Sequence, residues 1–396
     1  MTSLPCPLVA TGQQIGAGWT PALSVVKALA ALVEARRLGG AAVYWMADED
    51  HDRLEVAATV GFQGERLVRH RFAFQAPEHT AAGWLPWTAV QQGEAEALWG
   101  PLPEPRTAQA PTLRDHILAL GAPLWRRGLR PFSPTHPDVR QPIQEELERW
   151  RALGLEADLR RQAERLEQSG VPLALDPRTQ AAWFSLDPRT GLRLKLEPGD
   201  PCPRGAWLSP GAALRPLMQS LLLPGLAAVV LGPAERAYWR LTEPLWARVG
   251  LEPPRIVDRP SVYLLPQGLD LAPGQLEALR LGRWEAFQDA APPRPSSALA
   301  GVRPDPGWGP ALTGRFQQEL ARTRQRLAKL DRRLQRDQAA RTLGRDPERL
   351  RQLLFPLGRP QERVLPGLFW LRNEIIIERM EAGLGGGSGL VLVEQP

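Results

Sequence analysis

Two polar runs in the N-terminal part of the chain contain the residue types that acid–base and anion-binding chemistry need. The first, Asp48-Glu49-Asp50-His51-Asp52, places four carboxylates around one histidine. Adjacent carboxylates repel one another unless something positive neutralises them, so a purely structural role would be costly at a buried strand end. Carboxylates would also raise the pKa of the histidine and orient its tautomer, as a general base or acid requires. We therefore expect His51, Asp50, Asp52 and Glu49 to be the catalytic residues.

The same acidic run has two other interpretations. Acidic side chains are favourable in the first turn of a helix, so the run could simply be a solvated helix start. It could also hold a hard divalent cation such as Mg²⁺, whereas zinc would need further histidines at ligand spacing. We assign no residue as a metal ligand and leave Mg²⁺ open as a cofactor.

The second polar run is TGQQIG, residues 11–16, which follows an apolar strand-like segment. A turn from strand to helix offers free N–H groups and the positive end of a helix, which suit phosphate or carboxylate. It is neither a Walker loop nor a GxGxxG motif, and an ordinary turn is the alternative. We expect Gly12, Gln13, Gln14 and Gly16 to contact a substrate or nucleotide.

A third group of polar residues lies in segment 214–239. Arg215 and Gln219 are four residues apart and so share one face of a predicted helix. Glu235 and Tyr238 follow the next predicted strand. Taken alone, this segment is better explained as a packed pair of helices with one surface arginine and a core tryptophan.

Hydrophobic periodicity indicates the elements that position these runs. The pattern predicts a strand at 7–11, a helix at 21–38 and a buried strand at 41–47, which is a βαβ unit. Such a unit implies a parallel sheet whose ligand crevice lies beyond the carboxyl ends of its strands. Both polar runs would fall at that edge.

The alternation of helices and strands returns later in the chain and fits a continuation of a doubly wound sheet. Its predicted elements are a helix at 212–222, a strand at 226–231, a helix at 233–249 and a strand at 255–257. The intervening region is interpreted as an insertion, with helices at 112–120 and 141–168 and a hairpin that joins 181–187 to 191–197. Near the C-terminus we expect a helix at 366–382 and a strand at 389–394 that rejoins the sheet.

The net charge of +6 is concentrated in one segment of the 396 residues. Residues 315–351 carry a net charge of +7, which leaves −1 for the rest of the chain. Apolar residues in this segment alternate at spacings of four and three, the seam of a coiled coil: Phe316, Leu320, Thr323, Leu327, Leu330 and Leu334. We expect the helix to end near Gly344 and to pair with residues 271–287 or with a second subunit. Because aromatic residues are not interleaved with its charges, we expect no nucleic-acid partner.

Composition narrows the class of protein further. With 43% hydrophobic and 23% charged residues, the chain is typical of a globular protein. Two cysteines exclude a disulfide framework and favour a reducing compartment. The longest apolar stretch, 220–231, contains a proline and is too short to span a bilayer. We therefore expect a cytoplasmic protein with no membrane partner.

Five segments in order along the chain resemble one family, the cysteine-adding enzyme (cysteine ligase) of bacillithiol biosynthesis. They are GQQIGAGWTPALSVVK (12–27), VYWMADEDHDRLE (43–55), LSPGAALRPLMQSLLLPGLAAVVLGPAERAYW (208–239), DRPS (258–261) and LFPLGRPQER (354–363). The resemblance implies an α/β fold: a Rossmann-like doubly wound parallel sheet with helical and hairpin insertions and an appended α-helical coiled coil that supports a homodimer. On this basis residues 1–60 and 206–266 form the two halves of the core, 61–205 the insertion, 267–350 the coiled coil, and 351–396 a return to the core.

The resemblance implies amide formation between the carboxyl of cysteine and the glucosamine amine of glucosaminyl-malate. Activation of a free carboxylate suggests ATP as a cofactor. In this hypothesis His51 accepts the ammonium proton, and Glu49 binds the cysteine amine or Mg²⁺. Arg215 and Arg259 would bind the two malyl carboxylates, with Lys27 as a third candidate. The remaining residues that we expect to contact substrate or nucleotide are Gln219, Glu235, Tyr238 and Ser261.

Two other functions remain open at this point. The acidic run could hold a metal, which would make the protein a metal-dependent amide hydrolase, a deacetylase of the same pathway. Alternatively, the chain could be a non-catalytic coiled-coil scaffold with a relic nucleotide fold.

Overall fold

The structure is a computed structural model of the chain. It describes residues 6–63, 66–103, 111–266, 269, 271, 273–283, 299, 301–343, 352–387 and 389–394, without the side chains of 335–343. The chain divides into two compact units, Met1–Val262 with Glu362–Glu394 and Tyr263–Gln361. None of the helices in the described ranges combines the length and the apolar character needed to cross a membrane.

The first unit is built on a parallel sheet of five strands in the order β10-β9-β1-β2-β5. The strands are β1 (Leu8–Gln14), β2 (Ala41–Ala47), β5 (Leu129–Phe132), β9 (Leu226–Leu231) and β10 (Arg255–Asp258). From β1 the chain adds β2 and then β5 on one side; it later adds β9 and β10 on the other side of β1. This confirms the predicted doubly wound α/β sheet and puts its switch point between β1 and β9.

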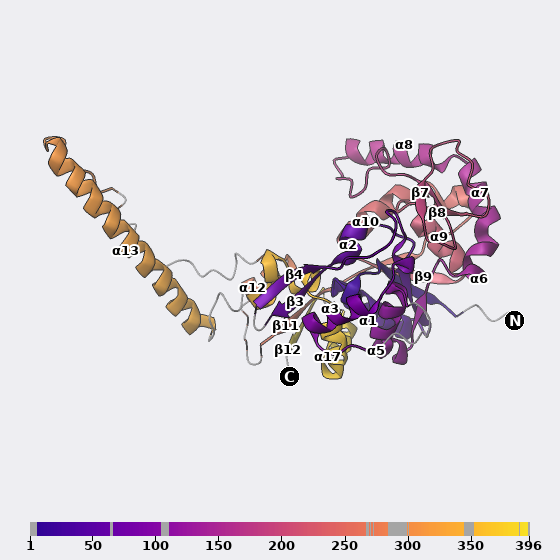
Figure 1. Cartoon of the computed structure of the whole chain (residues 1–396), viewed down its shortest axis with the longest axis horizontal. Coiled ribbons are helices and arrows are strands. Elements are labelled where there is room, and N and C mark those ends of the chain that lie inside the picture. Colours follow the sequence, from indigo (N-terminus) through magenta and orange to yellow (C-terminus); the bar gives the residue numbers. More distant parts are fainter. Residues whose placement is uncertain are drawn as a thin grey trace. The chain divides into compact units, whose positions relative to one another are not determined.

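Both faces of this sheet are covered, which explains why its strands read as continuous apolar runs. On one face α1 (Leu23–Arg37) contacts β1, β2 and β9, and α17 (Glu374–Gly385) packs against α1 (Figure 1). On the other face a core containing Ala10, Trp45 and Val229 packs against α7 (Gln144–Ala152), α8 (Leu155–Gln168) and α9 (Arg215–Leu222).

The predicted hairpin is present and has a third strand. β6 (Trp183–Leu186) pairs antiparallel with β7 (Arg193–Lys195) and also with β8 (Trp207–Pro210). A second hairpin, β3 (Ala58–Gln63) with β4 (Arg66–Arg71), was not predicted.

Several predicted elements need correction. Strand β5 lies within the region that we interpreted as an insertion, yet it is the edge strand of the main sheet. The predicted helix 141–168 is two helices, because Gly154 adopts a left-handed conformation (φ +65°) between them. The terminal strand β12 (Leu390–Glu394) does not rejoin the main sheet; it pairs with β11 (Ser261–Leu265).

The predicted helix at 233–249 is also interrupted. It consists of α10 (Pro233–Trp239), a 3-10 turn at Arg240–Thr242 and α11 (Trp246–Val249). The other helices of the first unit are α2 (Arg53–Ala57), α3 (Ala89–Trp99), α4 (Leu113–Leu120), α5 (Ala122–Arg126), α6 (Pro137–Arg140) and α16 (Leu368–Leu371), with 3-10 turns at Ala17–Trp19, Ala82–Trp84 and Gln141–Ile143.

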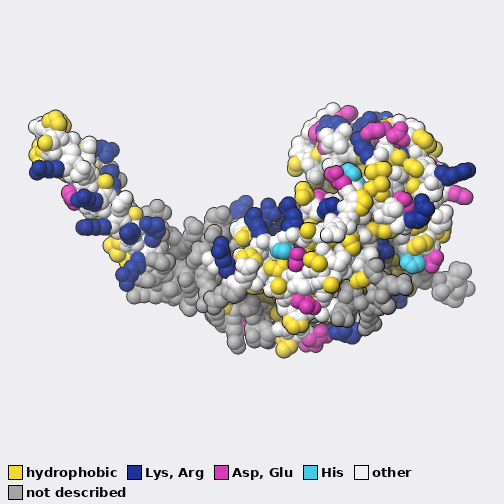
Figure 2. Space-filling view, in the orientation of Figure 1, with side chains coloured by type: hydrophobic (Ala, Val, Ile, Leu, Met, Phe, Trp, Pro, Cys, Tyr) yellow, Lys and Arg dark blue, Asp and Glu magenta, His cyan; other side chains and the backbone are white. Residues whose placement is uncertain are grey.

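The second unit contains α12 (Pro273–Arg280), the long helix α13 (Pro310–Leu343) and a 3-10 turn at Pro356–Gly358; α15 (Gln361–Val364) lies at the boundary. Lysine and arginine side chains line α13 (Figure 2). The predicted seam is largely open to solvent, with Leu330 and Leu334 43% and 41% exposed. The long helix is therefore confirmed, whereas its pairing as a coiled coil stays a prediction. Gly344 and residues 284–287 of the proposed partner segment lie outside the described residues.

Candidate functional site

Two adjoining cavities lie outside the carboxyl ends of β1, β2 and β9. The inner cavity has a volume of about 230 Å³ and the outer one about 750 Å³. They share Gln14, Asp50, Glu55, Ala212 and Arg215 in their walls, so together they form one crevice. This is the place where ligands bind in doubly wound sheets. Of the other predicted site residues, the inner cavity is lined by Gly12, Gln13, Gln219, Glu235 and Tyr238, and the outer one by His51 and Asp52.

The first two carboxylates of the acidic run are buried and face neither cavity. Asp48 accepts hydrogen bonds from Ser133 (2.6 Å) and Thr135 (3.1 Å) and forms an ion pair with Arg114 (2.7 Å). Glu49 is fully buried and accepts hydrogen bonds from Arg140, itself fully buried, and from Ser209, each at 2.9 Å.

Glu49 stays ionised because it is surrounded by guanidinium groups. Burial opposes its ionisation, but Arg140, Arg193 and Arg215 outweigh that cost and lower the pKa of Glu49. The expectation that Glu49 binds the cysteine amine or Mg²⁺ is wrong in this structure, because its carboxylate is enclosed by protein groups.

Asp50 is the carboxylate of the run that both cavities share. The Arg215 guanidinium donates to Asp50 Oδ2 at 3.2 Å, and Arg193 lies 3.7 Å from Oδ1. Burial tends to raise the pKa of Asp50, but these two arginines lower it overall. Asp50 is therefore a fixed anion whose main partners are protein cations.

His51 lines the outer cavity beside a second histidine. Its Nδ1 lies 3.3 Å from Arg193 Nη1, and its ring contacts His79 and Phe184 with centroid separations of 5.4 and 5.5 Å. Partial burial and the Arg193 charge lower the pKa of His51, despite Asp50 and Asp52. The predicted rise in the pKa of His51 is therefore wrong, because burial and the charge of Arg193, which is distant in sequence, outweigh the neighbouring carboxylates.

Asp52 and Glu55 belong to the short helix α2 that follows the run. Asp52 caps this helix by accepting from the backbone N–H groups of Leu54 and Glu55, both at 3.1 Å. The helix-start interpretation thus holds for Asp52. Glu55 lies in the walls of both cavities, and partial burial together with Asp52 and Asp50 raises the pKa of its carboxyl group.

At the end of β1 the polar groups are held mainly by one buried lysine. The Lys27 ammonium donates to the Gly12 carbonyl, to Gln13 Oε1 (3.2 Å) and to Glu235 Oε1 (2.6 Å). Burial lowers the pKa of Lys27, and the Glu235 carboxylate opposes that effect. Lys27 is fully buried and lines neither cavity, so it is not placed to bind malyl carboxylates.

The structure does not form the phosphate cradle that we expected at Gly12–Gly16. Thr11–Gln14 are still part of strand β1, and α1 begins only at Leu23. Ala22 N–H donates to the Leu365 carbonyl at 2.8 Å, so the start of this helix is already occupied by another segment. Gly12 instead allows close strand packing, since a Cβ there would come within 2.8 Å of the Trp45 carbonyl oxygen.

Three other predicted residues lie away from the cavity walls. Gly16 packs against the Thr20 carbonyl. Arg259 forms a buried ion pair with Glu362 at 2.8 Å, and Ser261 N–H donates to Gly389 at the start of β11. None of these three residues lines either cavity.

Arg193 and Arg140 are site residues that sequence reasoning missed. Arg193 comes from β7 of the hairpin, and Arg140 ends α6. With 49 basic residues in the chain, an isolated arginine carries little signal. The excess of carboxylates in the acidic run did indicate that positively charged groups outside the run must neutralise it.

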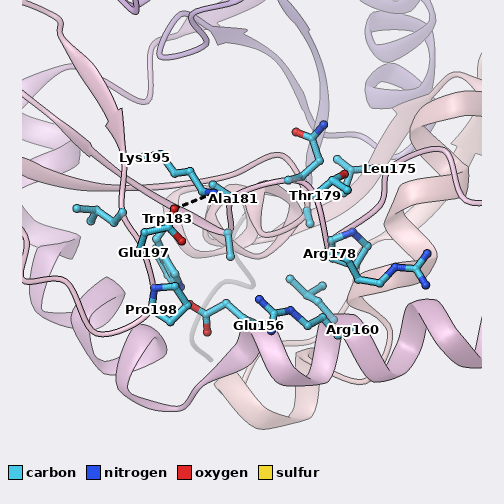
Figure 3. Close-up of a pocket in the computed structure, with 16 residues that line it drawn as sticks. Glu156, Arg160, Leu175, Arg178, Thr179, Ala181, Trp183, Lys195, Glu197 and Pro198 are labelled. Atoms are coloured by element: carbon cyan, nitrogen blue, oxygen red, sulfur yellow. Dashed lines mark ion pairs between the residues drawn. The ribbon is translucent and has the colours of Figure 1, made fainter.

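A third cavity, of about 110 Å³, lies between α8 and the β6–β7 hairpin (Figure 3). It shares Gln180 and Ala181 with the outer cavity. Three of the charged groups around it form ion pairs: Lys195 contacts Glu197 at 2.9 Å, and Arg178 contacts Glu167 and Asp176, each at 2.7 Å. No predicted site residue lines it. Within the described ranges, no three His, Cys, Asp or Glu side chains come together as a metal site.

Comparison with known proteins gives a consistent result. Residues 203–260 match the family model described as bacillithiol biosynthesis BshC, N-terminal Rossmann-like domain. The chain is 31% identical to proteins of two strains of Thermus thermophilus, named provisionally as cysteine ligase BshC, over 97% of this chain and 88% of theirs. It is 26% identical to a protein of the same name from Geobacillus thermodenitrificans, over 97% of this chain and 83% of that one.

Proposed function

Because the chain belongs to the BshC family of bacillithiol biosynthesis, we propose that it is a ligase that joins the carboxyl of cysteine to the glucosamine amine of glucosaminyl-malate. The observation that carries the proposal is the crevice itself. One pair of adjoining cavities, at the switch point of the sheet, is lined by Asp50, His51, Glu55 and Arg215. Anion-binding and proton-transferring groups therefore meet at one place, as amide formation requires.

The charge pattern of the crevice suits substrates that carry carboxylates. Arg53, Arg193 and Arg215 line the outer cavity, and guanidinium forks bind carboxylates in a bidentate manner. We propose that Arg53 and Arg215 hold the malyl group. The smaller inner cavity contains amide, hydroxyl and carboxylate groups from Gln13, Gln219, Tyr238 and Glu235, a set that can bind the ammonium and polar atoms of an amino acid such as cysteine.

Activation of the cysteine carboxyl by ATP remains part of the proposal, with a different phosphate site. The Gly12–Gly16 segment does not fit a triphosphate, because its backbone belongs to β1 and to a covered helix start. The outer cavity, which has a volume of about 750 Å³ and is lined by Arg53 and Arg215, is the better candidate, because guanidinium groups bind phosphate as they bind carboxylates. ATP would convert one carboxyl oxygen of cysteine into part of a phosphate leaving group. Any Mg²⁺ would be held largely by the phosphates, as is usual for this ion.

We also propose that the protein works in the cytoplasm as a homodimer joined through α13. Support for the dimer comes from the seam of α13, whose Leu330 and Leu334 are exposed in the single chain. Pairing two such seams would remove that apolar surface from water.

The experiment is to incubate the purified protein with cysteine, glucosaminyl-malate and one nucleotide at a time. Mass spectrometry should detect the condensation product only when both substrates and ATP are present, and AMP or ADP would identify an adenylate or an acyl phosphate. Arg215→Gln should reduce product formation, whereas Arg189→Gln, which alters an arginine that is 90% exposed, is the control. Absence of product with every nucleotide, together with cleavage of the N-acetylated precursor, would replace the proposal with the amide hydrolase.

A further inference from the structure

We infer that Glu55 accepts the proton released in amide formation, while Arg193 holds His51 as a neutral hydrogen-bond donor. The inference rests on the proposed function and assigns roles within its crevice. It reverses the expectation from the sequence, in which the histidine was the base.

Arg193 is anchored from several directions, so its position beside His51 is well defined. Its Nε donates to Ser209 Oγ at 3.1 Å and its Nη2 to the Pro210 carbonyl at 2.9 Å. Its guanidinium carbon lies 3.9 Å from the ring centroid of Phe184, and its side chain is 2% exposed. These contacts leave Nη1 directed at Asp50 Oδ1 (3.7 Å) and His51 Nδ1 (3.3 Å).

The contact with Arg193 decides the tautomer of His51. A guanidinium group can only donate hydrogen bonds, so Nδ1 of His51 must be the acceptor. A neutral imidazole whose Nδ1 accepts carries its hydrogen on Nε2. Such a ring donates from Nε2 and cannot take up a proton there. Protonation at Nδ1 would place two positive groups against each other at 3.3 Å.

Glu55 lines both cavities and is available to accept a proton, whereas Glu78, which also has no side-chain partner among the described contacts, lines the outer cavity alone. Asp50 is bound by Arg215, Asp52 caps α2, and Glu235 is bound by Lys27 and by Gly232 N–H (2.8 Å). No hydrogen bond or ion pair of the Glu55 side chain occurs among the described contacts, although it lies in the walls of both cavities. Its surroundings raise the pKa of the carboxyl group, which makes the carboxylate a stronger base.

Amide formation in this crevice releases two protons from the nitrogen, and each has an acceptor. Glu55 takes one proton from the ammonium group of the amino sugar, which frees the nitrogen lone pair. The nitrogen attacks the activated carboxyl carbon of cysteine, an acyl phosphate or acyl adenylate, and the C–N bond forms. The C–O bond to the phosphate group breaks and its electron pair leaves with that oxygen. The second nitrogen proton passes to the departing phosphate, and His51 Nε2–H donates to the carbonyl oxygen as negative charge develops there.

Several titratable and charged groups from neighbouring elements face Glu55 across the two cavities. They are Asp50, His51, Asp52, Arg53, Glu78, His79, Arg193, Arg215, Glu235 and Tyr238. All of them are retained in the variants below except where a variant changes one.

The first experiment compares Glu55→Gln with Glu96→Gln, a change of an exposed glutamate on α3. Glu55→Gln should lower kcat by about a hundredfold or more, the usual contribution of a general base, with KM values little changed. The wild type should gain kcat/KM as rising pH ionises Glu55, and this acid limb should be missing from the variant. Wild-type kinetics in Glu55→Gln would overturn the inference, and inactivity of the wild type would instead contradict the proposed function.

The second experiment tests the donor role of His51. His51→Gln keeps an N–H donor but no base, so it should retain activity within about tenfold of wild type, whereas His51→Ala should lose about a hundredfold. Equal losses in the two variants would contradict the donor role.

The third experiment reads the tautomer directly and needs no substrate. Nitrogen-15 NMR of the folded protein, which has five histidines, should show neutral His51 with its hydrogen on Nε2 near pH 7. Arg193→Gln should raise the pKa of His51, and Arg189→Gln on the same hairpin should not. A cationic His51 or an Nδ1–H tautomer in the wild type would overturn the inference.

Discussion

The acidic run after β2 consists of two halves that differ in surroundings although they are adjacent in sequence. Asp48 and Glu49 are fully buried and paired with Arg114 and Arg140. Asp50, together with His51, faces the crevice. Neighbouring acidic residues therefore have different roles: the buried ones form part of the core, and the more exposed ones line the crevice. A buried charge needs a buried partner, whereas a charge at a crevice can exchange its partner for a ligand.

The largest effect should come from the buried half. Arg140→Ala would remove the guanidinium that donates directly to the fully buried Glu49 carboxylate, and we expect the free energy of unfolding to fall by about 3–5 kcal/mol. Denaturant unfolding followed by circular dichroism measures this change. The control is Arg149→Ala, which removes an exposed pair with Glu146 and should cost about 1 kcal/mol or less. Equal losses would show that the burial of Glu49 does not govern its contribution.

The crevice half should respond in activity more than in stability. Arg215→Gln removes a cation from both cavities and from Asp50, and we expect kcat/KM to fall by about thirtyfold or more, corresponding to at least about 2 kcal/mol. Steady-state kinetics with each substrate varied gives this value. The free energy of unfolding of Arg215→Gln should fall by less than that of Arg140→Ala. A variant with full activity and lost stability would place Arg215 with the buried half instead.

A smaller effect, seen when pH is lowered, should distinguish the buried Glu49 from Glu55, the crevice carboxylate that follows the acidic run. The pKa of Glu49 is lowered in the folded state, so its contribution to stability is present above about pH 4.3 and is lost as pH falls through the folded value. The pKa of Glu55 is raised, so its base form disappears at higher pH. On acidification, activity should therefore decline before the contribution of Glu49 to stability is lost. Parallel rate and circular dichroism measurements test this order, and a common midpoint would contradict it.

The sequence predicted the sheet better than it predicted the site. Residues 226–231 form a strand with the expected bounds, because a strand buried on both faces is apolar throughout. Strand β5 escaped prediction, since Leu129–Phe132 is short, contains Pro131 and lies at the sheet edge.

For the site, strand ends predicted that Asp50 lies at the crevice, and the family resemblance added Arg215, Gln219 and Glu235, which line the same cavity. The division of the acidic run could not be predicted, because it depends on arginines distant in sequence. Lys27 was wrongly predicted to bind a malyl carboxylate for a related reason. A lysine in an otherwise apolar helix can point inward when a carboxylate from a distant segment, here Glu235, forms an ion pair with it.

The distance along the chain between partners has a consequence for synthesis on the ribosome. Arg140 follows Glu49 by 91 residues, and Arg193 follows His51 by 142. The first βα elements therefore leave the ribosome before the arginines that neutralise their carboxylates. The core around Glu49 can form only after the segment that contains Arg140 has been synthesised. Chains interrupted before Arg140 would lack the buried partner of Glu49, and chains interrupted before the β6–β7 hairpin would lack Arg193 and with it a complete crevice.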